Sequence, residues 1–495
     1  MYIIKEVTIM NVTTSSNLDI TKYNGIIIPC FEGQQPSLET LPQQTATYLK
    51  ANKFEGKYES KAMFAIPVQE TLVQYLFVGL GKKEELTVEK AMSVIGSAVK
   101  TLSKKELASV AVSFTEIEES ILTEHFVLSV VKACSLACYA FDKFMEKEKA
   151  KQKIETLTHI LPETYIQAVK KGVSIAEDIT LARLLVDEPA NLMKPKNVVE
   201  VATRVCQKAG IEMKVFEKEE IEKMNMNAFL SVAKGSDEEP RLIVMKYNGN
   251  PDSDEIVALV GKGLTYDSGG YSIKPTNSMI TMKSDMGGSA AVIGAMSAIA
   301  KEAPKINVVG IIATCENMIS GRAYLPGDVL TSMSGKTIEI VNTDAEGRLT
   351  LADAITYAIQ KEHATKIVDI CTLTGAVVVA LGEDYAGVIT REDSLWEDIQ
   401  ASAKTATESI WRMPIDKNFE KKNKSTIADI KNSGGRWGGC SSAGAFVGAF
   451  TEGKPWIHID IAGSAYLESE KPYFTAGATG SGVHLLTELV KHWAK

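Results

Sequence analysis

The sequence predicts a two-domain α/β protein, with a smaller N-terminal α/β domain and a larger C-terminal domain whose mostly parallel central sheet is covered by helices. The chain has 495 residues, more than one typical core accommodates. Apolar runs alternate with helical patterns along both halves, and a charge run, EKEKAKQK, lies between them at residues 146–153. We therefore predict domains at residues 1–150 and 191–495, joined by a connecting helix or linker at residues 151–190.

The N-terminal half has strand and helix patterns but no cluster of catalytic residue types. NGIIIPCF at residues 24–31 and VQYLFVGLG at residues 73–81 have the apolar composition of strands. TVEKAMSVIGSAVKTL at residues 87–102 and the run at residues 124–144 have helical periodicity. Another helical pattern, at residues 163–186, leads into the second half. We expect an α/β unit without a catalytic site of its own.

The second half alternates strands with helices, which predicts a mostly parallel sheet covered on both faces. The predicted strands are RLIVMKY (241–247), EIVALVGKG (255–263), INVVGIIATC (306–315), TIEIVNTD (337–344), KIVDICTLTG (366–375) and WIHIDIAG (456–463). The predicted helices are SAAVIGAMSAIAKEA (289–303), LTLADAITYAIQKEH (349–363) and GVHLLTELVKHW (482–493).

Composition and charge restrict the class of protein. The net charge is −8 and the sequence pI is about 5.6, which argues against a nucleic-acid surface along the whole chain. Seven scattered cysteines suggest core thiols in a reducing compartment rather than a disulfide framework. The N-terminus does not resemble a secretory signal, and the most apolar stretch, residues 126–144, contains Lys132 and Asp142. We expect a soluble cytoplasmic protein without a membrane span.

The most informative motif is NTDAEGRL at residues 342–349. It places the carboxylates Asp344 and Glu346 two residues apart, with the guanidinium of Arg348 two residues further on. In extended backbone, this spacing would point all three side chains to one side. Because like charges repel, a divalent cation between the acids and an anion on the arginine would relieve the cost of grouping them.

A second motif, GKGLTYDSGGYSIKPTNSMITMKSDMGG at residues 261–288, adds Lys262, Asp267, Lys274, Lys283 and Asp285 in a glycine-rich segment. The two motifs contain four carboxylates, three lysines, one arginine and no histidine. This inventory argues against a histidine-type or cysteine-type zinc site. Hard oxygen ligands suit Mn, Mg or Zn, and four carboxylates suffice for two ions.

The charged residues follow predicted strands, which suggests that they meet at one edge of the sheet. Lys262 is placed near the end of one strand, Asp344 at the end of another, and the turn at residues 372–375 at the end of a third. Ligand sites in open α/β sheets form at the carboxyl ends of strands. Asp285 and Arg348 directly precede predicted helices, and a helix start favours anions near Arg348.

These motifs resemble those of the leucyl aminopeptidase family, the dinuclear-metal cytosol exopeptidases. The match to NTDAEGRL is complete, and the resemblance covers roughly residues 180–490. The first 150 residues fit that family's N-terminal domain in size and pattern only. Further matching segments are CENMISGRAYLPGDVL, TLTGA, WIHIDIAGSA and GATGSGVHLL.

The resemblance implies a metal-dependent aminopeptidase that removes the N-terminal residue, leucine among others, from peptides with a free N-terminus. It implies two divalent ions, Mn or Zn, and attack by a hydroxide that bridges them. One ion would also bind the substrate's α-amine. The implied metal ligands are Lys262, Asp267, Asp285, Asp344 and Glu346.

The resemblance assigns Lys274 and Arg348 as catalytic residues. Lys274 would stabilise the negative charge that develops on the carbonyl oxygen. Arg348 would hold a bicarbonate that shuttles the proton to the leaving amine, as a site without histidine requires another acid–base group. The implied substrate-binding residues are Met282, Thr372, Leu373, Gly375 and Ala462, with Ala465 beside them. The resemblance also suggests a homohexamer.

Alternative interpretations remain at this point. His458 and Asp460 could be ligands, but alternation in a buried strand favours a hydrogen-bonded core pair. A metal-dependent phosphoesterase would also use carboxylates and two ions, although such sites usually contain histidine. A DNA-binding or regulatory role on the same fold, additional to peptidase activity or in its place, is disfavoured by the acidic charge.

Overall fold

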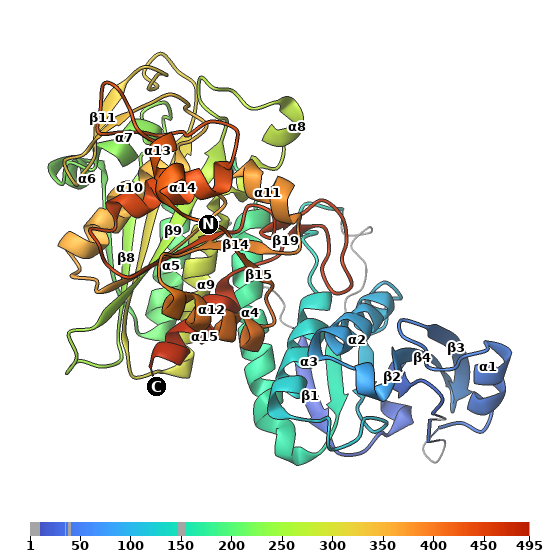
Figure 1. Cartoon of the computed structure of the whole chain (residues 1–495). Helices are drawn as coiled ribbons and strands as arrows, with labels where there is room; N and C mark the ends of the chain where they lie inside the picture. Colours follow the sequence, from blue (N-terminus) through green and yellow to red (C-terminus); the bar gives the residue numbers. More distant parts are fainter. Residues whose placement is uncertain (1–9, 35, 38–40, 147–153, 495) are drawn as a thin grey trace. The chain divides into compact units, whose positions relative to one another are not determined.

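The computed structural model describes residues 10–34, 36–37, 41–146 and 154–494, and this part of the chain forms two compact units (Figure 1). One unit contains the described residues up to Glu177 together with Ser469–Ala476. The other contains Asp178–Glu468 and the described residues from Gly477 onward. Helix α4, Ile166–Asp187, contributes residues to both units.

The N-terminal unit is built on a six-stranded sheet with the order β1-β6-β5-β2-β4-β3. All neighbouring pairs are parallel except β3 and β4. The strands are β1 (Asn11–Ser15), β2 (Gly25–Phe31), β3 (Lys61–Val68), β4 (Thr71–Gly81), β5 (Ser109–Ser113) and β6 (Thr156–Ile160). The helices are α1 (Thr45–Ala51), α2 (Val88–Ser103) and α3 (Glu124–Ala137), with 3-10 turns at Ile20–Lys22, Lys83–Glu85 and Glu163–Tyr165.

Two apolar layers lie on the faces of this sheet. Helices α2 and α3 pack with Ile27 and Leu76 on one face, and Leu49 of α1 packs with Ile26 and Phe77 on the other. The near-continuous apolar character of β2 and β4 therefore reflects burial on both faces. The predicted strands and the helix at residues 87–102 are confirmed here.

The helix predicted for residues 124–144 is shorter in the structure. Helix α3 ends at Ala137, because the N–H groups of Cys138 and Tyr139 bond to the carbonyls of Ser135 and Leu136 in a tightened last turn. Residues 147–153 of the predicted charge run lie outside the described residues. All seven cysteines are free thiols, and only Cys138 is not fully buried.

The larger unit is built on an eight-stranded mixed sheet with the order β15-β14-β17-β13-β9-β10-β8-β7. The four central strands, β17, β13, β9 and β10, are parallel, whereas β14, β8 and β7 introduce antiparallel pairs toward the edges. The strands are β7 (Glu212–Phe216), β8 (Arg241–Asn248), β9 (Ile256–Asp267), β10 (Asn307–Asn317), β13 (Lys366–Cys371), β14 (Ala386–Ile389), β15 (Ile410–Arg412) and β17 (Trp456–Asp460).

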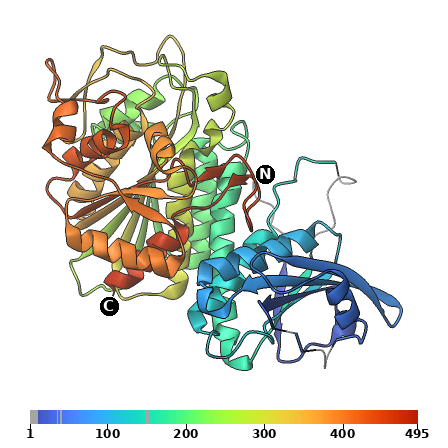
Figure 2. The ribbon, with the colours of Figure 1, turned by 45° about the vertical axis from the view of Figure 1, so that its right-hand side comes forward.

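Helices cover both faces of this sheet, as the near-continuous apolar strands predict. Helices α9, α12 and α15 lie on one face, and α7, α10 and α14 lie on the other (Figures 1 and 2). The helices are α5 (Pro195–Ala209), α6 (Lys218–Lys223), α7 (Asn227–Ala233), α8 (Thr276–Met279), α9 (Gly287–Glu302), α10 (Gly347–Gln360), α11 (Gly375–Leu381), α12 (Asp393–Ala406), α13 (Lys417–Lys422), α14 (Gly439–Val447) and α15 (Val483–Trp493), with 3-10 turns at Met282–Met286 and Gly448–Phe450.

One predicted strand of the main sheet is wrong. TIEIVNTD contributes only β12 (Thr337–Glu339), which pairs with β11 (Val329–Thr331) and β16 (Ile430–Lys431) in a separate small sheet. The reason is that its following backbone groups bond to loops: Ile340 N–H donates to Asp328, and the side chain of Asn432 accepts from Val341. A two-stranded ribbon, β18 (Tyr466–Leu467) with β19 (Gly477–Ala478), completes the strands.

None of the described helices has both the length and the apolar character of a membrane span.

Candidate metal and catalytic centre

A β-bulge brings Lys262 and Asp267 to the same face of the sheet. Both residues lie in β9, five positions apart, and regular alternation would point them to opposite faces. Lys262 pairs with Ala313 and Asp267 with Asn317, but the register shifts between them so that Thr265 is extra. Sequence analysis placed Lys262 near the end of its strand. That prediction is wrong, because pairing with β10 extends β9 to Asp267.

Close helix packing brings the remaining charged residues to Lys262. A Cβ on Gly288, at the start of α9, would lie 2.1 Å from the carbonyl oxygen of Ile370. A Cβ on Gly347, at the start of α10, would lie 2.3 Å from Cε of Lys262. Both helices therefore begin against the sheet because these positions lack a side chain. Asp285 directly precedes α9, and Glu346 is the N-cap of α10.

Lys262 is the centre of one buried ionic group. Its Nζ lies 2.8 Å from Oδ1 of Asp285 and 2.9 Å from Oε1 of Glu346, and it donates to the carbonyl oxygen of Thr372 at 2.9 Å. Thr372 also donates its hydroxyl hydrogen to Asp285. Residues from β9, α10 and the segments that precede α9 and follow β13 therefore meet at one amine.

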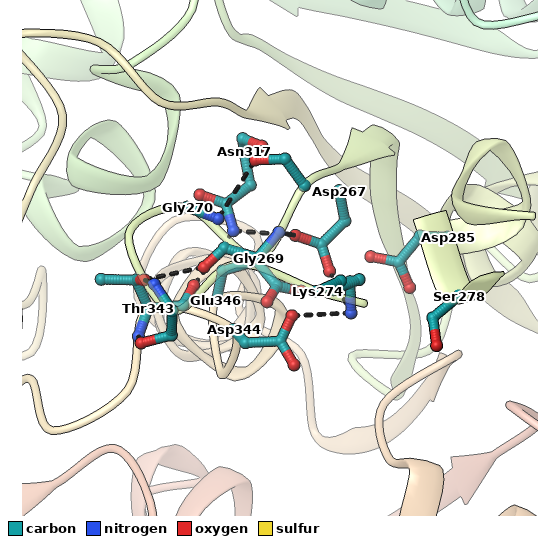
Figure 3. A network of polar contacts seen from close by, with 12 residues as sticks. Asp267, Gly269, Gly270, Lys274, Ser278, Asp285, Asn317, Thr343, Asp344 and Glu346 are labelled. Carbon is teal, nitrogen blue, oxygen red and sulfur yellow. Dashed lines mark hydrogen bonds and ion pairs between the residues drawn. The ribbon is translucent and has the colours of Figure 1, made fainter. Parts of the chain in front are cut away.

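Lys274 is the centre of a second group beside the first (Figure 3). Its Nζ lies 2.8 Å from Oδ2 of Asp267 and 2.7 Å from Oδ1 of Asp344. Carboxylate oxygens of Asp267, Asp344 and Glu346 all lie within 4.8 Å of one another, so these three acids could share a metal ion. The predicted convergence at the carboxyl edge of the sheet is the arrangement the structure has.

Burial and neighbouring charges shift the pKa values of the acids and of the lysine in this centre. Burial and the nearby charge of Glu346 raise the pKa of Asp267 to about 6. Burial also raises the pKa of Asp285 well above its ordinary value. Burial by itself would lower the pKa of Lys262, but Asp285 and Glu346 outweigh burial and raise it. The two lysines thus act as internal cations for acids that outnumber them.

Two buried carboxylate oxygens of the centre have no hydrogen-bond partner among the described residues. Oδ2 of Asp285 and Oε2 of Glu346 make no hydrogen bond with any residue that the structure describes. A buried carboxylate oxygen without a partner costs free energy, and a cation would offset that cost. The donor set of carboxylates and one amine fits divalent cations that accept hard ligands.

The NTDAEGRL motif is not extended, in contrast to the sequence-based expectation. Asp344 lies in a turn, Glu346 has helical backbone angles, and Arg348 is in the first turn of α10. The physical reason is that the side chain of Asn342 accepts from the N–H of Asp344, which bends the chain into the helix. The acids still meet, but through this turn rather than through strand alternation.

Arg348 is buried and held by a loop distant in sequence. Its Nη1 donates to the carbonyl oxygen of Asn432 at 2.7 Å, and burial lowers the pKa of the guanidinium. Asn432 is fully buried, accepts from the N–H groups of Val341 and Asn342, and donates to the carbonyls of Asn342 and Ala345. Asn432 therefore joins the loop after β16 to the turn that carries Asp344.

Two of the expected substrate-binding residues, Thr372 and Ala465, lie beside the start of α9. A Cβ on Gly287 would lie 3.2 Å from Cγ2 of Thr372 and 3.3 Å from Cβ of Ala465, so both side chains lie close to the backbone two residues after Asp285. Leu373 and Ala462 both donate their N–H groups to Oδ1 of Asp460. Three further placements complete the set: Met282 starts the 3-10 turn before α9, Gly375 starts α11, and Ala462 follows β17.

The polar residues of β17 belong to the core. His458 and Asp460 are fully buried, as expected, but each has a different partner from the one predicted. Nδ1 of His458 lies 2.6 Å from Oδ1 of Asp369, while Asp460 accepts from Leu373 and Thr374. Strand β13 and the turn after it supply these partners, because β13 pairs with β17 in parallel register.

Sequence analysis missed three polar residues that hold the centre together: Asn317, Thr343 and Asn432. All three are fully buried. Two lie inside matched motifs, CENMISGR and NTDAEGRL, but their bonds go to groups far away in the sequence. The position of Asn317 just after the predicted strand at residues 306–315 is the only sequence signal that could have drawn attention to it.

Two family models match most of the chain. Residues 180–487 match the model of the cytosol aminopeptidase family, catalytic domain, and residues 27–148 match that family's N-terminal domain. A probable cytosol aminopeptidase of Clostridium perfringens is 44% identical over 96% of this chain and 98% of its own length. That of Clostridium tetani is 46% identical over 84% of this chain and 88% of its own length.

A solved structure shares the fold across both units. The bottromycin maturation enzyme BotP in complex with Mn superposes with a TM-score of 0.86 at 28% identity, covering 95% of this chain and all of that one. Fold, site and matches together define a metal-dependent hydrolase. The chain belongs to the cytosol aminopeptidase family and is a metallo-exopeptidase of that family.

Proposed function

We propose that this aminopeptidase removes the N-terminal residue, leucine among others, from peptides with a free N-terminus, and that two divalent ions bind at the centre described above. The proposed ligands are Lys262, Asp267, Asp285, Asp344 and Glu346. The observation that carries the proposal is the meeting of these side chains at one sheet edge, with two buried carboxylate oxygens unpaired. All of them lie in the predicted catalytic segment, residues 191–495.

Manganese or zinc suits the donor set best, because both accept carboxylate oxygens together with an amine nitrogen. A similar protein, BotP, has been solved in complex with Mn. When bound, two divalent cations lower the pKa of water so that hydroxide forms near neutral pH. Lys262 would have to lose its proton to become a ligand.

The catalytic roles fall to two cationic side chains. Lys274 is partly buried beside Asp267 and Asp344, which together raise its pKa despite burial, so its ammonium is available to stabilise a carbonyl oxygen that becomes negative. Arg348 donates one hydrogen bond to Asn432, while its buried Nε has no partner among the described residues. That N–H could hold a bicarbonate, which would carry the proton to the leaving amine.

The region of Thr372 and Ala465, close to Asp285, is the proposed site for the substrate's first side chain. Met282, Thr372, Gly375, Ala462 and Ala465 would line this site, and the backbone of Leu373 would contact the substrate. The surroundings of Gly375 support this role, because a Cβ added there would meet no atom within 4 Å. We also propose that the protein is a homohexamer and that it is cytoplasmic. The name cytosol aminopeptidase, given to its relatives, supports the cytoplasmic location.

The test is hydrolysis of leucine p-nitroanilide by purified protein, after chelation and then with added Mn²⁺ or Zn²⁺. Glu346→Gln should abolish release, because it removes a charged ligand candidate at the N-terminus of α10. Glu362→Gln is the matched control, since Glu362 follows the other end of the same helix and pairs with Lys246. We expect metal-restored release in the wild type and the control only.

Absence of release with either metal, from folded wild-type protein and across several N-terminal residues, would contradict the proposal. Equal activity in Glu346→Gln and the wild type would contradict the assignment of the metal centre while leaving the peptidase activity intact.

A further inference from the structure

Asn317 is the last residue of β10 and lies directly beside Asp267, the last residue of β9. The bulge at Thr265 turns Asp267 toward the face of Lys262. Asn317 is the partner of Asp267 in the neighbouring strand, so it points to the same face. Its side chain is completely buried. The motif around it, CENMISGR, has no role in the function proposed above, although the asparagine adjoins the candidate centre (Figure 3).

The amide of Asn317 joins the two motifs that carry the charged residues. Nδ2 donates to Oδ1 of Asp267 at 2.8 Å and to the backbone carbonyl of Thr343 at 3.0 Å. Thr343 immediately precedes Asp344. The backbone carbonyl of Asn317 also accepts from both the N–H and the hydroxyl of Ser268. One buried residue therefore holds the loop after Asp267 and the turn before Asp344 at the same time.

Thr343 reinforces this connection from the other side. Its hydroxyl donates to the carbonyl of Gly269 at 2.7 Å and accepts from the N–H of Ser272 at 2.7 Å. Its own N–H donates to the hydroxyl of Ser272. These bonds tie the 267–274 loop to the 342–346 turn, yet none of them reaches a carboxylate. Among the side chains of these residues, that of Asn317 is the one that also bonds to an acidic side chain of the centre.

The bonds from Asn317 and Gly269 hold the carboxylate of Asp267 in one orientation. Oδ1 accepts from Asn317 and from the N–H of Gly269, at 2.8 Å and 2.9 Å. Oδ2 is the oxygen that lies 2.8 Å from Nζ of Lys274. A carboxylate with one oxygen held by two donors cannot rotate without losing both bonds. The other oxygen, Oδ2, therefore keeps its direction.

We propose that Asn317 is a positioning residue that orients Asp267 and fixes the Asp344 turn against it, and thereby sets the affinity of the centre for divalent metal. This inference rests on the proposed metal centre. Partners that orient metal ligands in this way typically change affinity by about 10–100-fold when they are removed.

The experiment compares two buried asparagines at opposite ends of β10. Asn307, the first residue of the strand, donates to three backbone carbonyls and accepts from the N–H of Asn250, distant from the centre. Mn²⁺ affinity of metal-free full-length protein is measured by isothermal titration calorimetry. The electron paramagnetic resonance spectrum of bound Mn²⁺ provides a second readout.

We expect Asn317→Ala to weaken Mn²⁺ binding by about 10–100-fold and to change the spectrum of the bound ion, whereas Asn307→Ala leaves both unchanged. If circular dichroism shows that Asn317→Ala is unfolded, Asn317→Ser replaces it in the same measurements. Unchanged affinity in the folded Asn317 variant, or an equal loss in both asparagine variants, would overturn the proposal. Asp267→Ala separates the two claims: if it binds Mn²⁺ as the wild type does, the metal centre itself is wrong.

Discussion

At the residue scale, two glycines allow close packing against different groups, one against backbone and the other against a side chain. Gly288 faces the backbone carbonyl of Ile370, which cannot move without disturbing the central sheet. Gly347 faces the far end of the Lys262 side chain, which can move. Close packing at Gly288 therefore supports the fold, whereas close packing at Gly347 determines where an amine of the candidate centre lies.

We predict that the two alanine variants separate stability from metal binding. Gly347→Ala should remain folded but displace Lys262, because its Cβ would lie 2.3 Å from Cε and 2.7 Å from Nζ. Its Mn²⁺ affinity and peptidase activity should fall, while its melting temperature changes little. Gly288→Ala should lower the melting temperature strongly, because backbone must move to make room for the new methyl group. We expect the free energy of unfolding to fall by roughly 2 kcal/mol or more. Equal melting temperatures for the two variants would contradict this assignment.

At the element scale, α10 supports both the centre and a neighbouring helix. Its N-cap is Glu346, and Asp353 in its interior is fully buried against α7. Oδ2 of Asp353 accepts from the N–H of Phe229, in the first turn of α7, and Oδ1 accepts from the N–H of Met333. The N-cap of α7, Met226, offers no side-chain acceptor, so Asp353 supplies from α10 what the α7 sequence lacks.

This buried carboxyl gives a prediction for stability against pH. Burial raises the pKa of Asp353 from 3.8 to about 7, although bonds from backbone N–H groups oppose the rise. Between those values the unfolded chain has lost the proton and the folded chain retains it. The contribution of Asp353 to the free energy of unfolding therefore falls as pH rises from about 4 to 7 and is constant above that range.

The measurement is thermal unfolding of the wild type and Asp353→Asn at pH 5, 6, 7 and 8. Because asparagine does not titrate, the melting temperature of the wild type relative to the variant should decrease as pH rises to 7. All other titrating groups are shared and cancel in the difference. A difference that stays constant or grows with pH would show that folding does not raise the pKa of Asp353.

At the scale of the whole molecule, the chain is divided into two compact units with separate sheets and separate apolar cores. Every residue of the candidate centre lies in the unit formed by Asp178–Glu468 and the residues from Gly477 onward. A ligand that binds only the folded state stabilises what it binds, by about 2.7 kcal/mol at a free concentration 100 times its Kd. Bound metal should therefore stabilise only the unit that contains the candidate centre.

Differential scanning calorimetry tests this expectation. We predict that Mn²⁺ raises the temperature of one unfolding transition and that chelation lowers it, while the transition of the N-terminal unit changes little. Limited proteolysis at each temperature identifies which unit has unfolded. A metal-dependent shift of the N-terminal transition by the same amount would indicate that the two units unfold together.

The sequence by itself determined the fold class, the family and the identity of the charged residues. Long apolar strands, helical periodicity and two charged motifs are local patterns, and local patterns survive in a single sequence. It also predicted that the charged motifs converge, because ligand sites in open α/β sheets form at the carboxyl ends of strands, although the strand before Asp344 belongs to a separate small sheet.

Only the tertiary structure decided how those residues are held. The bulge at Thr265 adds one residue without any periodic signal, yet it turns Asp267 to the face of Lys262. Asn317 bonds to a carboxylate 50 positions away, and Asn432 accepts from Arg348 across 84 positions. A buried amide can bond to any donor or acceptor that folding brings near. Its partners follow from three-dimensional packing, which residue type and spacing do not specify.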